Sequence, residues 1–147
     1  MSEMIEKKIR DAFPNAVVET TDVHGILNIR LNPSALLPVC EMLQSNAELA
    51  FDYLADVTGI DWKDRIEVVY QLTAIEKNVR IALRVNLERE RPEVDSVTSV
   101  WKGADFQERE VFDLMGVVFK GHPDLRRILL PEDWEGYPLR KDYVIPD

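Results

Sequence analysis

The chain has 147 residues, 46% of them hydrophobic and 31% charged, and its formal net charge is -9. This composition predicts one soluble globular domain that folds without a metal or a disulfide. The acidic charge disfavours nucleic acid and anionic lipid as partners, because like charges repel phosphate groups.

The N-terminal quarter predicts a helix followed by a hairpin. Apolar residues at helical spacing indicate a helix over residues 2–13, with Ser2 as its N-cap. Residues 17–21 and 26–31 are β-branched or alternate between apolar and polar, and a His-Gly pair lies between them. They are typical of two strands joined by a tight turn.

The middle of the chain predicts a helix and three strands. A helix is expected from about residue 33 to 45, with Pro38 shifting its start or kinking its first turn. Residues 51–58 read as a strand closed by Gly59. Residues 65–75 and 78–85 predict two further strands joined by a short turn.

After a polar connector at residues 88–92, the pattern becomes helical again. Residues 95–101 favour a short helix, and a longer helix is expected over 106–115, ending at Gly116. Asp105 followed three residues later by a glutamate predicts a capping box at its start. A short strand over residues 117–120 completes the expected elements.

The last 27 residues have another character. Four prolines interrupt this part, and neither helical nor strand periodicity persists, yet large apolar and aromatic residues are frequent. Disordered tails are usually poor in such residues, so this segment must bury them. Part of it could lie on its own domain, but we expect an arm of this length to lie mainly on a partner. The predicted fold class is α+β: a largely antiparallel sheet with helices packed on one face, followed by an extended C-terminal arm. The predicted division is a compact domain over residues 1–120 and an arm over residues 121–147.

Motifs for autonomous chemistry are missing. No dinucleotide-binding glycine pattern occurs, and the glycines at 116 and 121 are not followed by the lysine and hydroxyl of a P-loop. The single cysteine, Cys40, cannot supply the four thiolates of an iron–sulfur cluster. His24 and His122 are far apart in the sequence, whereas metal ligands normally show local spacing. The chain also has no secretory signal and no stretch of roughly 20 apolar residues that could span a bilayer, so we expect no direct membrane insertion.

Charged residues concentrate from Glu108 to Tyr143. Those of the helix can be explained as a solvated face, since a pair such as Arg109 and Asp113 stabilises a helix by only about 0.2–0.5 kcal/mol. The arginines near aromatic residues further on have the composition of interface anchors. The candidate partner-contact residues are Glu108, Arg109, Glu110, Asp113, His122, Asp124, Arg126, Arg127, Trp134, Arg140, Lys141, Asp142 and Tyr143.

These motifs resemble a known family. Glu-Arg-Glu-Val-Phe-Asp-Leu-Met, six residues, and His-Pro-Asp-Leu-Arg-Arg-Ile-Leu are similar to the signature of the small hydrophilic, C-type subunit of respiratory complex I (NADH-quinone oxidoreductase). The continuation through Tyr143 and the stretch Asp56–Asp61 also resemble family positions. Tyr137 departs from the family, in which histidine is frequent there.

The resemblance implies a non-catalytic structural subunit of a proton-translocating NADH:quinone oxidoreductase. It implies binding to the large subunit that helps form the quinone site, called the quinone-site subunit below, and to neighbouring iron–sulfur subunits, on the cytoplasmic side of the membrane. No cofactor is expected in this chain, and FMN, iron–sulfur clusters and quinone are expected on other subunits. Independently of the resemblance, Arg126 and Arg127 are among the few cations of an acidic chain, so we expect Arg126→Ala or Arg127→Ala to impair assembly more than folding.

Two alternatives remain open. The same module could serve a membrane-bound hydrogenase or a dehydrogenase that uses ferredoxin or another electron donor. A more remote alternative is an autonomous enzyme in which His122 works with Asp113 or Asp124 as general acid and base.

Overall fold

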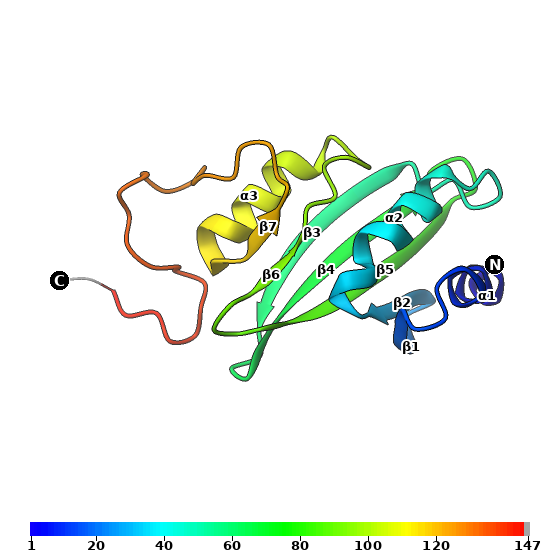
Figure 1. Ribbon diagram of the computed structural model, residues 1–147, viewed down its shortest axis with the longest axis horizontal. Coiled ribbons are helices and arrows are strands. Elements are labelled where there is room, and N and C mark those ends of the chain that lie inside the picture. The colour runs from blue at the N-terminus through cyan, green and yellow to red at the C-terminus, as the bar shows by residue number, and fades with distance from the viewer. Residues whose placement is uncertain (146–147) are drawn as a thin grey trace.

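A five-stranded sheet organises the computed structural model, which describes residues 1–145 (Figure 1). Its strands, in their order across the sheet, are β1 (Val17–Val23), β2 (Ile26–Leu31), β5 (Val79–Glu88), β4 (Arg65–Ala74) and β3 (Tyr53–Asp61). Every pairing in this sheet is antiparallel except that of β2 with β5. The expected largely antiparallel sheet is therefore confirmed.

Within residues 1–145, three α-helices pack against one face of this sheet. They are α1 (Ser2–Ala12), α2 (Leu36–Ser45) and α3 (Ala104–Met115), with a short 3-10 turn (Pro33–Ala35) before α2. Their buried apolar residues join alternate residues of the strands, such as Ile29, Tyr70 and Leu83, in one core cluster. Alternate strand residues point to the same face, so the shared cluster places the helices on that face. The α+β class is confirmed.

The helix starts differ from expectation in small ways. The cap position of α1 is Met1, and no side chain among the described residues caps the helix, so the prediction that Ser2 is the N-cap is wrong. Pro38 lies in the first turn of α2, where no intrahelical N–H bond is required of it. The helix therefore begins three residues later than the sequence signal suggested.

One predicted boundary and one predicted helix are wrong. β3 continues through Gly59 to Asp61, because its whole length pairs with β4. The predicted helix over residues 95–101 is absent: β6 (Glu93–Asp95) runs into a turn, and β6 pairs in parallel with β7 (Val118–Lys120). The backbone groups of residues 93–96 form hydrogen bonds with the β7 strand, so they are not available for the hydrogen bonds of a helix.

The end of α3 follows the prediction. Gly116 adopts the left-handed conformation (φ 80°), and its N–H donates to the carbonyl of Phe112. This is the expected C-terminal glycine stop.

Residues 121–145, called the C-terminal segment below, contain no helix or strand. Figure 1 shows this segment running from the end of β7 along one side of α3 and then away from the sheet. Pro146 and Asp147, the last residues of the predicted arm, lie outside the described residues. Among residues 1–145, no helix is both long and apolar enough to cross a membrane.

Candidate protein interface

Glu108 faces the interior of the domain. Its side chain is fully buried; Oε1 accepts a hydrogen bond from the Ser96 hydroxyl (2.6 Å), and Oε2 accepts the Val97 N–H (2.8 Å). Burial raises the pKa of Glu108, although these two bonds oppose the shift. The capping-box prediction is wrong, because this glutamate holds the turn after β6 and does not cap the start of its own helix.

Asp113, one turn further along α3, holds the start of the C-terminal segment. Its Oδ2 accepts backbone N–H groups from Ile128 (3.2 Å), Leu129 (2.7 Å) and Leu130 (3.0 Å). Its Oδ1 accepts a hydrogen bond from Nη1 of Arg127 at 2.7 Å. Burial alone would raise the pKa of Asp113, but these hydrogen bonds lower it below the ordinary value. One buried carboxylate therefore fixes four consecutive residues.

Arg127 and Tyr137 continue this attachment. Nη2 of Arg127 donates to the carbonyl of Gly136 at 2.7 Å. The guanidinium carbons of Arg127 and Arg140 lie 5.1 and 5.5 Å from the centre of the Tyr137 ring, within cation–π range. That ring also covers Gly116, where a Cβ atom would lie 2.8 Å from it. Glycine at position 116 is thus required both by the helix end and by the ring packed on it.

The carbonyls at the end of α3 provide a second attachment. The Leu139 N–H donates to the carbonyl of Leu114 (3.0 Å), and Nε of Arg140 donates to that of Met115 (2.6 Å). The last carbonyls of a helix have no partner within it, so the segment satisfies groups that would otherwise need water.

Asp61, at the end of β3, provides the third attachment. Its Oδ2 accepts the Lys141 N–H at 2.8 Å, and its Oδ1 accepts the Lys63 N–H at 2.8 Å and a bond from Arg89. Arg89 also pairs with Asp142 at 3.2 Å. The hydrogen bond from Arg89 is the main reason that the pKa of Asp61 lies far below its ordinary value.

Two further candidate residues are used inside the chain. Nε and Nη2 of Arg109 donate to the carbonyls of Arg126 (3.2 Å) and Arg127 (3.3 Å). His122 accepts the Asp124 N–H on Nδ1 at 2.9 Å, and its Nε2 lies 3.1 Å from the Asp105 carbonyl. Since Nδ1 accepts, the proton of the neutral ring is assigned to Nε2.

While its polar groups are tied to the domain, the C-terminal segment turns apolar side chains outward. The exposed apolar side chains of the segment are Leu129, Trp134, Leu139, Val144 and Ile145, and Phe106 of α3 is exposed as well. Large exposed apolar residues gathered on one segment are a usual feature of protein interfaces.

The structure separates the predicted contact residues by exposure. Buried ones are Glu108, Arg109 and Asp113; half-buried ones are His122, Arg127, Arg140 and Tyr143; exposed ones are Glu110, Asp124, Arg126, Trp134, Lys141 and Asp142. Their contact with a partner stays a prediction. Sequence reasoning missed the attaching roles of Asp61 and Arg89, for which the one available signal was the family-like stretch ending at Asp61.

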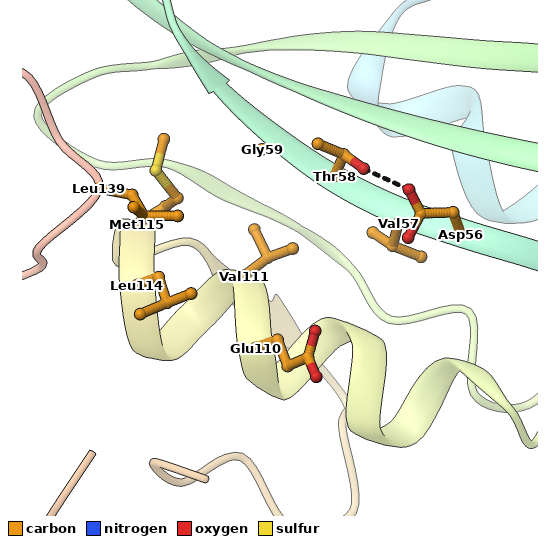
Figure 2. A pocket seen from close by; sticks show the side chains of 9 residues that line it. All are labelled: Asp56, Val57, Thr58, Gly59, Glu110, Val111, Leu114, Met115 and Leu139. Atoms are coloured by element: carbon orange, nitrogen blue, oxygen red, sulfur yellow. Dashed lines mark hydrogen bonds between the residues drawn. The ribbon is translucent and has the colours of Figure 1, made fainter. Parts of the chain in front are cut away.

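A small hollow lies between β3 and α3, beside this segment (Figure 2). Its volume is about 190 Å³, and its lining includes Val57, Val111, Met115 and Leu139. Pockets that hold a drug-sized ligand usually measure about 300–1,000 Å³, so the hollow suits a side chain better than a cofactor. Within residues 1–145, no three His, Cys, Asp or Glu side chains come together in a way that could hold a metal ion.

Comparison with known proteins gives one consistent family. The family described as "Respiratory-chain NADH dehydrogenase, 30 Kd subunit" matches residues 29–147. A C-type NADH-quinone oxidoreductase subunit from Roseiflexus sp. (strain RS-1) is 41% identical over 139 residues, covering 92% of this chain and 80% of that protein. The corresponding protein of Moorella thermoacetica is 48% identical over 117 residues, covering 76% and 79%.

Two solved structures share the fold. The trypsin-resistant fragment (1–134) of Nqo5 superposes with a TM-score of 0.69 at 30% identity, covering 85% of this chain and all of the fragment. A chain of the membrane-bound sulfane sulfur reductase, an archaeal respiratory membrane complex, superposes with a TM-score of 0.81 at 25% identity. The superposition covers 97% of this chain and 85% of that one.

Proposed function

Because the chain belongs to the family of the 30 kDa subunit of respiratory-chain NADH dehydrogenase, we propose that it is a non-catalytic assembly subunit that binds the quinone-site subunit. As part of an NADH-quinone oxidoreductase it works with other subunits. The finer proposal is that it lies in the peripheral arm, on the cytoplasmic side of the membrane, and joins the quinone-site subunit to neighbouring iron–sulfur subunits.

The C-terminal segment carries this proposal. Its backbone is fixed by Asp113, by the carbonyls ending α3 and by Asp61, while Leu129, Trp134 and Leu139 stay exposed. A segment already ordered before binding loses less conformational entropy when a partner covers it. Exposed apolar side chains on a fixed backbone are therefore suited to tight association with another subunit.

We place the redox chemistry on the other subunits. FMN, the iron–sulfur clusters and quinone are proposed to bind there, and this chain is proposed to bind none of them. Cys40 is buried in the core, and burial holds the pKa of its thiol far above the ordinary value, which disfavours the thiolate form that binds metal.

Co-purification tests the proposal. The double variant Leu129→Ser/Trp134→Ser removes two exposed apolar groups without touching the side chains that attach the segment. We expect its recovery with the quinone-site subunit from solubilised membranes to fall by at least about tenfold, since interface aromatics often contribute 2 kcal/mol or more. Val18→Ser, on exposed strand β1, is the matched control. Recovery equal to that of wild type would remove the segment from the interface, and deletion of residues 121–147 tests the whole segment in the same way.

A second candidate function is the equivalent subunit of a related membrane complex with another electron donor, such as a membrane-bound hydrogenase. The structural similarity to a chain of the sulfane sulfur reductase complex supports this second candidate. The two differ in the neighbouring genes: one for a flavin-bearing NADH subunit favours the first, and one for a nickel-binding large subunit favours the second. NADH oxidation by the purified complex gives the direct answer.

The acid–base enzyme has little support from the geometry. The His122 side chain has no exposed surface, and both ring nitrogens face groups of the chain itself. A general base must reach a substrate proton, and this imidazole is not placed to do so.

A further inference from the structure

The hollow beside α3 has an open strand edge as one of its walls. Within residues 1–145, β3 lies at the edge of the sheet and pairs only with β4, so every second residue turns its N–H and C=O groups outward. Residues 56–59 of this edge line the hollow, opposite Glu110, Val111 and Leu114 of α3. Figure 2 shows the strand and the helix on either side of the space.

The floor of the hollow is apolar, since Val57, Val111 and Met115 line it, and the helix comes very close to the strand there. A Cβ atom on Gly59 would lie 3.1 Å from the Val111 side chain and 3.2 Å from that of Met115. Glycine therefore allows the close approach, and a side chain at position 59 would push the two walls apart. Leu139 of the C-terminal segment closes one end, next to Met115 (Figure 2).

The other end of the hollow is acidic. The carboxylates of Asp56 and Glu110 stand on opposite walls, away from Leu139 (Figure 2). Among residues 1–145, neither carboxylate has a Lys, Arg or His side chain at ion-pair distance. Asp56 accepts a hydrogen bond from the Thr58 hydroxyl. Two carboxylates beside an apolar floor are complementary to a cation next to an apolar group.

We propose that this groove docks an extended, basic segment of another subunit. One apolar side chain of that segment, of leucine or methionine size, fills the space over Val111 and Met115. A lysine or arginine near it lies between Asp56 and Glu110, and the backbone adds to the free edge of β3. Strand addition of this kind takes affinity from backbone hydrogen bonds and specificity from side-chain pockets. The inference rests on the proposed function only in assuming that the chain works inside a complex.

Photo-cross-linking in the assembled complex tests the groove. The photo-reactive residue benzoylphenylalanine replaces Leu114, which lines the groove. This replacement leaves both carboxylates in place. We expect a cross-link to a partner segment that has an apolar residue close to a Lys or Arg. The charge-reversed variant Asp56→Lys/Glu110→Lys should lower the cross-link yield about tenfold or more, as like charges oppose docking. Glu41→Lys, on the exposed face of α2, is the matched control and should leave the yield unchanged.

The outcomes separate the groove from the proposed function. Three results would overturn the groove, even if the chain is recovered with the quinone-site subunit. They are the absence of a cross-link, a cross-link to an acidic segment, and a cross-link yield that does not change on charge reversal. A cross-link to a segment that has an apolar residue close to a Lys or Arg supports the groove, whichever subunit carries that segment. Thermal melting of the isolated variants, equal to that of wild type, confirms that the charge reversal acts at the surface.

Discussion

The sheet domain and the C-terminal segment are held by different forces. In the domain, alternate strand residues and three helices bury a continuous apolar core. In the segment, side-chain carboxylates and helix-end carbonyls hold the backbone, and Leu129, Trp134 and Leu139 are left exposed. The domain is thus stable through burial, whereas the segment is ordered by polar bonds at a few points.

This difference indicates how the molecule is divided between folding and association. The free energy gained from apolar burial is roughly proportional to the area removed from water, and the domain buries most of its large apolar groups. The segment buries its apolar groups less completely: Leu125 packs against the core, whereas Leu129 and Leu139 stay exposed. Its attachment should therefore be easier to lose than the core, and its loss should affect association more than global stability.

The largest expected effect is a break in the domain. Phe51 is buried in the core, and Phe51→Ala should lower the free energy of unfolding by about 3–5 kcal/mol, from lost burial and the cavity left behind. Urea denaturation measures the change. Leu129→Ala, on the exposed side of the segment, should change this free energy by no more than about 0.5 kcal/mol. Similar losses for both variants would mean that the segment belongs to the cooperative core.

The next effect is a break in the segment. Asp113→Ala removes the acceptor of three backbone N–H groups and of Arg127. It should lower the free energy of opening the segment by about 2–3 kcal/mol, since hydrogen bonds to charged groups are the stronger kind. Hydrogen exchange at the amides of residues 128–130 measures this opening. Glu110→Ala, on the exposed side of the same helix, should leave that exchange unchanged.

Two neighbouring arginines sharpen the comparison. Arg127 is mostly buried and bonds to Asp113 and Gly136, whereas Arg126 is exposed and pairs with acidic side chains of the segment itself. Arg127→Ala should lower the free energy of opening the segment by about 1–3 kcal/mol, and Arg126→Ala should have an effect near zero on stability. Hydrogen exchange at the amides of residues 128–130 measures both. With these results, the sequence-based expectation that both variants impair assembly more than folding would hold for Arg126 alone.

The smallest expected effect is a pH dependence of opposite sign at the two buried carboxylates of α3. The folded pKa of Asp113 is lowered, so its contribution is complete above the ordinary pKa near 3.8 and is lost as the pH falls below it. The folded pKa of Glu108 is raised, so its contribution is complete below about pH 4.5 and decreases as the pH rises through the folded pKa.

Isosteric variants separate these two contributions. Relative to wild type, Glu108→Gln should gain stability as the pH rises above about 4.5, and Asp113→Asn should lose its disadvantage as the pH falls below about 3.8. Denaturation at several pH values measures both differences. Glu110→Gln, on the exposed face, is the control; a pH-dependent gain in it equal to that of Glu108→Gln would refute the assignment.

Local sequence patterns predicted most elements because those elements depend on local chemistry. The helix stop at Gly116 and the hairpin at His24 and Gly25, both with positive φ, follow from turn-forming residues. The turn after residue 95 was mistaken for a helix, since the parallel partner strand β7 that competes with a helix lies 25 residues away. Tertiary pairing overrode local propensity there.

The candidate site was predicted in position but not in the direction of its side chains. A charged helix face looks the same in sequence whether it meets solvent, a partner or its own chain. Glu108 and Asp113 turned out to be buried, because Val97 and residues 127–130 supply donors that no periodicity reveals. Asp61 bonds to Lys141 across 80 residues, a distance at which only the fold brings them together.

The parallel pairing of β2 with β5 also has a consequence in time. Leu27 lies beside Ile81, and more than 50 residues of chain separate them. On the ribosome, the N-terminal hairpin emerges first but has no neighbour until β5 has been made. The antiparallel β3–β4–β5 meander, with its short turns, can form as a unit, because loop closure is least costly for local pairs. We expect the first strands synthesised to be the last to join the sheet, so the nascent chain keeps an open strand edge until translation passes residue 88.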